Sequence, residues 1–308
     1  MPDEFAANHG VSRRGFIRMG VAGGVSLLFV DRLGLAAPAK TDVWVFHNED
    51  KTKLMDACLK VIAERGKFGR DVKKLTLKVN AAWIRTPEQG ANTHPELVSA
   101  FLKGCRGFGI KNIVLPEHPC NPGRFSFPKS GILQVAKANG AKMFDLGSNR
   151  KLYKEVAIPK GRRLKKAMVG RDFLETDALV NMPVAKHHGA TTLTMAMKNW
   201  LGAVLDRGFW HRSGLHQCIA DFSSFIKPTW TIIDATKIMM DRGPNGPSKN
   251  MKHPNLLILS RSQVAADTYA STLFHDSPEK VPYLRIARQM KLGPTKLTEI
   301  AVHKVEVD

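Results

Sequence analysis

The feature that most constrains the fold is an alternation of short apolar runs with segments of helical periodicity. Residues 42–47 form the first apolar run, and residues 51–65 follow with apolar side chains at a helical spacing. Runs at 75–80 and 111–116 are each followed, after a loop, by another helical segment. Strands connected in this way pair in parallel, and their helices cover both faces of the sheet. The sequence therefore predicts an α/β fold with a mostly parallel, doubly wound, Rossmann-like sheet.

The same alternation continues to the C-terminus. Further strands are expected at 142–146, 177–183, 230–234, 255–260 and 300–307, and helices at 93–108, 131–139, 192–205, 213–225, 264–274 and 284–290. The Pro- and Gly-bearing segments 118–128 and 241–247 are expected to be loops. The basic segment 147–170 is expected to be irregular, with a small hairpin around 156–159. We interpret residues 40–308 as a single α/β domain.

Residues 1–39 have the pattern of an export signal. Arg13 and Arg14 precede a weakly hydrophobic stretch at 19–30, and small residues follow at 37–39. The apolar stretch is shorter than a membrane-spanning helix. Paired arginines ahead of such a stretch are typical of the twin-arginine pathway. We therefore predict export by the twin-arginine translocase to the periplasm, with no transmembrane domain in the mature chain; a short N-terminal membrane anchor is the alternative.

Charge and cysteine spacing narrow the classes of ligand. The formal net charge of +20 favours nucleic acid, anionic lipid or acidic small molecules as partners. An exported protein does not meet genomic DNA, so we expect no nucleic acid and consider an anionic small molecule instead. The spacings of Cys58, Cys105, Cys120 and Cys218 match no iron–sulfur or zinc motif. These cysteines are interpreted as core residues or as partners in one or two disulfides.

Polar residues gather where the predicted strands end. Lys78 and Asn80 end the second apolar run, Glu117 follows the third, and Asp234 ends a later one. In doubly wound sheets, ligands bind in the crevice beyond the carboxyl ends of the strands. Strand ends also attract polar residues because they are solvated, so the inference depends on the set rather than on any single residue.

The densest group of cationic and titratable side chains lies in residues 183–221. Its members are Lys186, His187, His188, Lys198, His211, Arg212 and His216. Lysine ammonium groups suit phosphate or carboxylate, so Lys78, Lys186 and Lys198 are expected to bind an anion. The histidines suit acid–base chemistry near neutral pH. Metal ligation is the other interpretation, although their spacing is neither HExxH nor i,i+4 on one helix.

Several of these motifs occur in an order that resembles a known family. They are KVN at 78–80, a Pro-Glu pair ending at Glu117, PVAKHH at 183–188, MKNWLG at 197–202, WHRSGLHQCIAD at 210–221 and TIIDA at 231–235. Together they resemble the family called "domain of unknown function 362", over about residues 42–290. Some members carry an iron–sulfur segment, whose cysteine run this chain lacks.

The resemblance implies a set of site or site-supporting residues. These are Lys78, Asn80, Glu117, Lys186, His188, Lys198, Asn199, His211, His216, Asp221 and Asp234. The arrangement of Lys186, His188 and Lys198 is also similar to the N-terminal domain of lactate racemases, in which a His and a Lys serve a nickel pincer nucleotide cofactor. The turn at 189–192 lacks the glycine run of that family, so covalent attachment of a cofactor at Lys198 does not carry over.

We therefore expect an exported enzyme or cofactor-dependent protein with an anionic ligand site, whose substrate and reaction the sequence does not name. The expected catalytic residues are His188, His211, Lys198 and Glu117, and the expected ligand-binding residues are Lys78, Asn80, Lys186, Asn199, His216, Asp221 and Asp234. Twin-arginine export often carries folded proteins with a cofactor in place, so a metal or nucleotide-type cofactor stays open. The alternative is a non-catalytic periplasmic protein that binds an anion or docks on a partner. Attachment to anionic lipid through the basic segment 147–171 is a third interpretation.

Overall fold

The computed structural model describes residues 39–66, 71–275 and 277–308, so the predicted signal residues Arg13 and Arg14 lie outside the described residues. Lys40–Asp308 forms one unit. The strands are β1 (Thr41–His47), β2 (Lys74–Val79), β3 (Asn112–Glu117), β4 (Lys142–Asp145), β5 (Tyr153–Ala157), β6 (Lys166–Gly170), β7 (Ala178–Met182), β8 (Val184–His188), β9 (Thr192–Thr194), β10 (Trp230–Met239), β11 (Met251–Lys252), β12 (Leu256–Ser260) and β13 (Ile300–Glu306).

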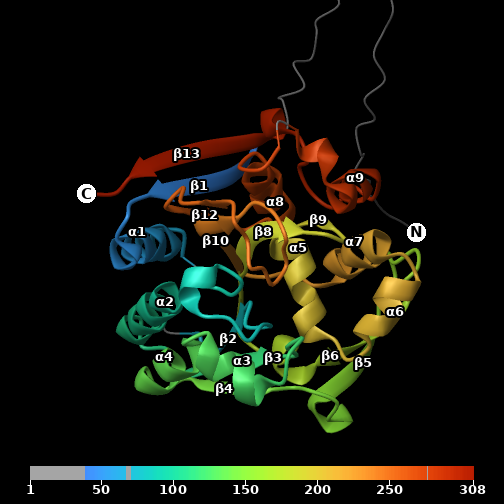
Figure 1. Ribbon diagram of the computed structural model, residues 1–308, viewed down its shortest axis with the longest axis horizontal. Coiled ribbons are helices and arrows are strands. Elements are labelled where there is room, and N and C mark those ends of the chain that lie inside the picture. Colours follow the sequence, from blue (N-terminus) through green and yellow to red (C-terminus); the bar gives the residue numbers. More distant parts are fainter. Residues whose placement is uncertain (1–38, 67–70, 276) are drawn as a thin grey trace, which may run out of the picture. The chain divides into compact units, whose positions relative to one another are not determined.

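Most of these strands form one mixed sheet in the order β13-β1-β12-β10-β7-β2-β3-β4 (Figure 1). The strands from β10 to β4 are parallel to one another, and β13 is parallel to β1. β12 is antiparallel to both β1 and β10. The predicted α/β class with a mostly parallel sheet is confirmed, with β12 as an antiparallel insertion.

Helices cover both faces of the sheet. They are α1 (Lys51–Glu64), α2 (Pro95–Gly107), α3 (Gly123–Lys129), α4 (Ile132–Ala138), α5 (Ala196–Asn199), α6 (Arg207–Arg212), α7 (Leu215–Phe225), α8 (Gln263–Ser271) and α9 (Pro282–Gln289). α1, α2 and α4 pack on one face, and α5, α7, α8 and α9 on the other (Figure 1). A hydrophobic core lies on each face of the sheet. Because side chains alternate along a strand, Val43 and Val45 pack in one core and Trp44 and Phe46 in the other.

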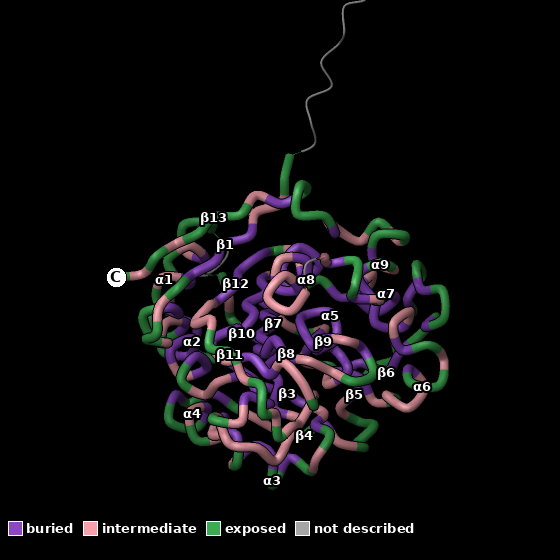
Figure 2. Tube along the Cα trace, turned by 45° about the horizontal axis from the view of Figure 1, so that its top comes forward, coloured by how far each residue is buried: buried purple, intermediate pink, exposed green. Residues whose placement is uncertain are grey.

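Burial is deepest in the middle of the sheet, beside the site described below. All five residues of β7 are buried, whereas β13 at the sheet edge is largely exposed (Figure 2). Each apolar side chain buried in this way contributes about 1.5–3 kcal/mol. No helix among the described residues is long and apolar enough to cross a membrane.

The prediction of a helix over residues 192–205 was wrong. Instead, β8 and β9 form an antiparallel hairpin, followed by the short helix α5 and a 3-10 turn, Trp200–Ala203. The β-branched Thr194 favours a strand, and β8 gains a second partner in β10. Lys186 and His188 therefore lie within a strand rather than in a loop after one.

Two other segments contain more structure than predicted. The expected loop at 118–128 includes most of α3, and α6 was not predicted at all. The basic segment 147–170 does form a hairpin, in which β5 and β6 pair as a separate two-stranded sheet. Its strands begin and end several residues outside the expected 156–159.

Candidate functional site

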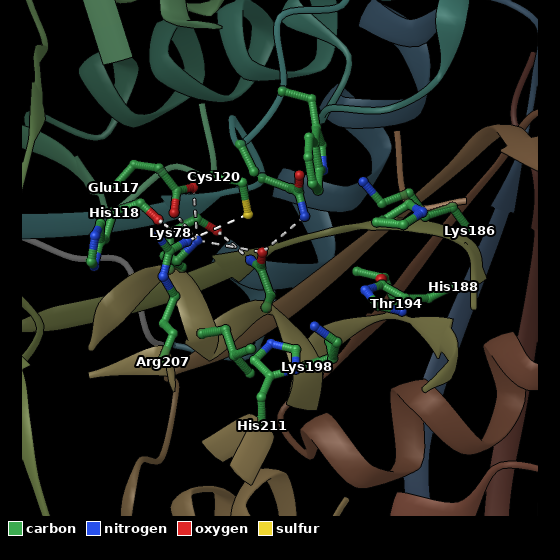
Figure 3. Close-up of a pocket in the computed structure, with 17 residues that line it drawn as sticks. Lys78, Glu117, His118, Cys120, Lys186, His188, Thr194, Lys198, Arg207 and His211 are labelled. Carbon is green, nitrogen blue, oxygen red and sulfur yellow. Dashed lines mark hydrogen bonds and ion pairs between the residues drawn. The ribbon is translucent and has the colours of Figure 1, made fainter. Parts of the chain in front are cut away.

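A cavity of about 300 Å³ lies beyond the carboxyl ends of β2 and β3 and beside β8 and α5. Most of the predicted site residues line it: Lys78, Asn80, Glu117, Lys186, His188, Lys198, Asn199 and His211. The labelled members of this group point toward a common space in Figure 3. The topology explains the convergence, because parallel strands bring their carboxyl ends to the same edge of the sheet.

One half of the pocket is built around an ion pair between Lys78 and Glu117. Lys78 Nζ lies 3.0 Å from Oε1 and 2.9 Å from Oε2 of Glu117, and the two side chains are 1% and 2% exposed. The amide of Ala81 also donates to Glu117 Oε2 at 3.2 Å. Burial lowers the pKa of Lys78 and raises the pKa of Glu117, and each charge offsets part of the shift of the other. This half is electrically balanced.

Asn199 and Gly202 complete this half. Asn199 Nδ2 donates to Asn181 Oδ1 at 2.8 Å, and Asn199 Oδ1 accepts from Lys78 Nζ at 3.4 Å. Gly202 stands directly over the ion pair, and a β-carbon there would overlap Glu117 Oε1 and lie 2.8 Å from Lys78 Nζ. A glycine is needed here for close approach of the backbone.

The other half of the pocket contains Lys186 and Lys198, which have no carboxylate partner among the described residues. Lys186 Nζ, fully buried, donates to the backbone oxygen of Ala91. Lys198 is 7% exposed, and its Nζ has no hydrogen-bond or ion-pair partner among the described residues. Burial lowers the pKa of Lys186 to about 7 and that of Lys198 to about 8. Two amines are therefore buried without a counter-charge.

His188 and His211 face these amines as neutral rings. Burial, with the charges of Lys198 and Lys186 adding to it, lowers the pKa of His188 to about 3. Burial and then Lys198 also lower the pKa of His211. The amide of Ala190 donates to His188 Nδ1 at 3.1 Å, which assigns the ring proton to Nε2. Both rings are available as acid–base groups.

Two buried oxygen atoms at the pocket have no hydrogen-bond partner among the described residues, Asn80 Oδ1 and Thr194 Oγ1. Buried polar atoms are nearly always satisfied in folded proteins. These two acceptors, of which Thr194 is also a donor, lie where a bound molecule would complete them. The pocket therefore contains cations without an anionic partner and polar oxygen atoms without hydrogen-bond partners among the described residues.

Arg207, His118 and Cys120 also line the pocket but were not among the predicted site residues. Arg207 donates from Nη1 to the backbone oxygen of His118 at 3.1 Å and contacts Cys120 Sγ at 3.4 Å. Asp206, which caps α6 by accepting from the amide of Phe209 at 2.9 Å, was the available signal. A helix start recognised there would have placed Arg207 in the first turn, facing the site.

Asp221 and Asp234 do not line the pocket. Asp221 accepts from the amides of Arg163 and Leu164 at 2.7 and 2.9 Å and so holds the loop between β5 and β6. Asp234 accepts from the amide of His94 at 2.9 Å, just before α2. The structure places both carboxylates in backbone-supporting roles.

His216 is likewise outside the pocket, half-buried on α7 with no partner for Nδ1 among the described residues. Of the histidines that suggested a metal, His188 and His211 line the pocket, whereas His187 and His216 do not. Within residues 39–66, 71–275 and 277–308, no group of three or more His, Cys, Asp and Glu side chains is placed to hold a metal ion.

The fold and the site define an α/β protein with a cationic pocket at the carboxyl ends of parallel strands. The chain belongs to the family described as "domain of unknown function (DUF362)", whose model matches residues 75–272. It is 23% identical to the thylakoid-associated protein sll1697 of Synechocystis sp. over 246 residues, which covers 77% of this chain and 74% of that protein.

Among solved structures, the chain is similar to the lactate racemase apoprotein of Thermoanaerobacterium thermosaccharolyticum. The TM-score is 0.38 and the sequence identity 11%, over 74% of this chain. The chain spans 56% of the length of that protein.

Proposed function

We propose that this protein binds a small organic anion in the pocket and performs acid–base chemistry on it. The observation that carries the proposal is the burial of Lys186 and Lys198 without a carboxylate partner among the described residues. Uncompensated buried charge costs several kcal/mol. A bound dicarboxylate or phosphate would offset the charge of both amines, and Arg207, which also lines the pocket, offers a further cation.

The only carboxylate among the described residues lining the pocket is Glu117, and Lys78 already neutralises it. The anionic charge that the other half requires must therefore come from a ligand. Neutral His188 and His211 supply proton acceptors beside it. The groups line one shared cavity, which favours an enzyme over a docking surface, where they would be spread out.

The experiment is calorimetric titration of the purified full chain with glutarate and with inorganic phosphate at pH 6.5. Lys186→Met and Lys198→Met are expected to weaken binding at least tenfold. Lys103→Met, on the exposed face of α2, is the matched control and is expected to bind as the wild type does. Equal binding by all variants, or no binding of either anion, would contradict the proposal.

We propose in addition that the protein is periplasmic and is exported by the twin-arginine translocase. Arg13 and Arg14 ahead of the weakly apolar stretch at 19–30 support this location. Replacing both arginines by lysine is expected to retain the protein in the cytoplasm, as measured by cell fractionation. Unchanged periplasmic recovery of the double variant would refute the proposed route.

A further inference from the structure

Lys198 differs from the other two lysines of the pocket in having a free amine. Lys78 Nζ is paired with Glu117, and Lys186 Nζ donates to Ala91. Lys198 Nζ has neither kind of partner among the described residues, although it is buried and lines the cavity. An amine placed in this way is available to react rather than occupied in holding the fold.

The backbone next to Lys198 is held by hydrogen bonds to Asp267. The buried carboxylate of Asp267 accepts from the amide of Ala196 at 2.7 Å and from the amide of Met197 at 3.0 Å. Both amides belong to the first turn of α5, the helix that carries Lys198. The backbone from which Lys198 extends is therefore held in place before a ligand binds, which favours a covalent step.

The surroundings of Lys198 match those of a nucleophilic amine. Burial, with the nearby charge of Arg207 adding to it, lowers its pKa to about 8. A substantial fraction of the amine is then neutral near pH 7.5, and desolvation beside another cation is a recognised way to activate lysine. Figure 3 shows Lys198 next to His211, with Lys186 on one side and Arg207 on the other.

We infer that Lys198 forms a Schiff base with the carbonyl group of a 2-oxo acid whose carboxylate is bound by Lys186 or Arg207. The inference rests on the proposed anion site and names its substrate class. A 2-oxo acid supplies both the negative charge that the pocket lacks and an electrophilic carbon next to it. Its oxygen atoms could also accept a hydrogen bond from the unpaired hydroxyl of Thr194.

The step is redox-neutral and needs no co-reactant. The neutral amine adds to the ketone carbon, the C=O π electrons move to oxygen, and the resulting carbinolamine carries one new C–N bond. The nitrogen then loses its second proton, the C–O bond breaks, and the oxygen leaves as water with both amine hydrogens. His211 is placed to take a proton from nitrogen and return it to the leaving hydroxyl. The product is a C=N bond and one water molecule.

The experiment is reductive trapping on the purified full chain with 2-oxoglutarate and sodium cyanoborohydride at pH 7.5. Reduction converts the imine to a stable secondary amine, which intact-mass and peptide-mapping measurements locate. We expect a single adduct on Lys198 in the wild type, suppressed by excess glutarate, which has the same length and charge but no ketone. Lys198→Arg is expected to form no adduct, whereas Lys103→Arg is expected to react as the wild type does.

Mapping on the wild type keeps the test decisive even if Lys198→Arg misfolds, as its unfolding midpoint would reveal. An adduct on Lys186, adducts scattered over surface lysines, or no adduct although glutarate binds would each overturn the Schiff base and leave the proposed anion site standing. Absence of both the adduct and glutarate binding would remove the proposed function as well.

Discussion

The two halves of the pocket bury similar charges but neutralise them differently. In one half, Lys78 and Glu117 lie within 3.0 Å of each other and Asn199 supports them. In the other half, Lys186 is fully buried and Lys198 is 7% exposed, but neither forms an ion pair among the described residues. The first arrangement is complete without a ligand, and the second is not.

The difference separates stability from function within a single cavity. Removing one member of a buried pair leaves the other member uncompensated, which destabilises the fold. Removing an unpaired buried cation relieves a desolvation cost and should stabilise the fold while weakening ligand binding. Substitutions in the two halves should therefore change stability in opposite directions.

The largest effect is expected for Glu117→Gln in the paired half. The substitution keeps the shape of the side chain but leaves Lys78 buried without its carboxylate, and should destabilise the protein by about 3–5 kcal/mol. The free energy of unfolding from urea titration at pH 7 measures it. A loss of unfolding free energy below about 1 kcal/mol would show that the Lys78–Glu117 ion pair does not stabilise the fold.

Gly202→Ala tests the same half through sterics rather than charge. A β-carbon at this position would overlap Glu117 Oε1 and crowd Lys78 Nζ. Overpacking of this kind costs about 1–3 kcal/mol. The expected loss of unfolding free energy should shrink when Gly202→Ala is combined with Glu117→Gln, because both disturb the same contact. Full additivity of the two losses would contradict the contact.

In the unpaired half, Lys198→Met should stabilise the ligand-free protein by about 1–3 kcal/mol at pH 6. The pKa of Lys198 falls from its ordinary 10.5 to about 8 on folding. The unfolded chain therefore binds more protons between pH 8 and 10.5, so wild-type stability rises through that window. The free-energy cost of burying protonated Lys198 is fully present below pH 8. The free energy of unfolding of Lys198→Met should therefore rise less than that of the wild type between pH 8 and 10.5. Destabilisation by Lys198→Met at pH 6 would break the comparison.

The affinity for glutarate should fall as pH rises. The anion binds the protonated amines, and burial sets their pKa values in the free protein at about 7 for Lys186 and about 8 for Lys198. Affinity should be constant near pH 6 and then weaken by up to about tenfold per pH unit for each lysine, with proton uptake on binding. Calorimetry in two buffers of different ionisation enthalpy measures both quantities. Affinity that is level from pH 6 to 9 would exclude these amines as the anion ligands.

Much of the fold was predictable because its signals are local. The runs at 42–47 and 75–80 are rich in apolar and β-branched residues and become β1 and β2. The segment 184–194 was not predictable, because the strand β8 carries Lys186 and two histidines and forms only through pairing with β9 and β10. A non-local pairing of polar residues leaves no periodic signature.

The candidate site was likewise predictable where its signals are local and not where they depend on distant segments. Lys78, Asn80 and Glu117 were placed at strand ends, and the sheet brings them together. Asp221 and Asp234 were included because their motifs lie in family order, but order does not tell whether a carboxylate faces a cavity or accepts from backbone amides. That distinction depends on the position of distant loops, which single-sequence patterns do not contain.

The smallest expected effect concerns the mouth of the pocket. Of the four cysteines, all free, Cys120 is exposed, whereas Cys58, Cys105 and Cys218 are buried. Alkylation of the native protein by iodoacetamide should therefore label Cys120 first. Because Cys120 Sγ lies 3.4 Å from Arg207 Nη1 at the pocket lining, glutarate at ten times its dissociation constant should slow labelling about tenfold. The protection reports occupancy of the pocket, so at the same glutarate concentration it should fall to about twofold or less in Lys198→Met and persist in Lys103→Met. Protection that is equal in both variants would place the anion outside the half that lacks a counter-charge.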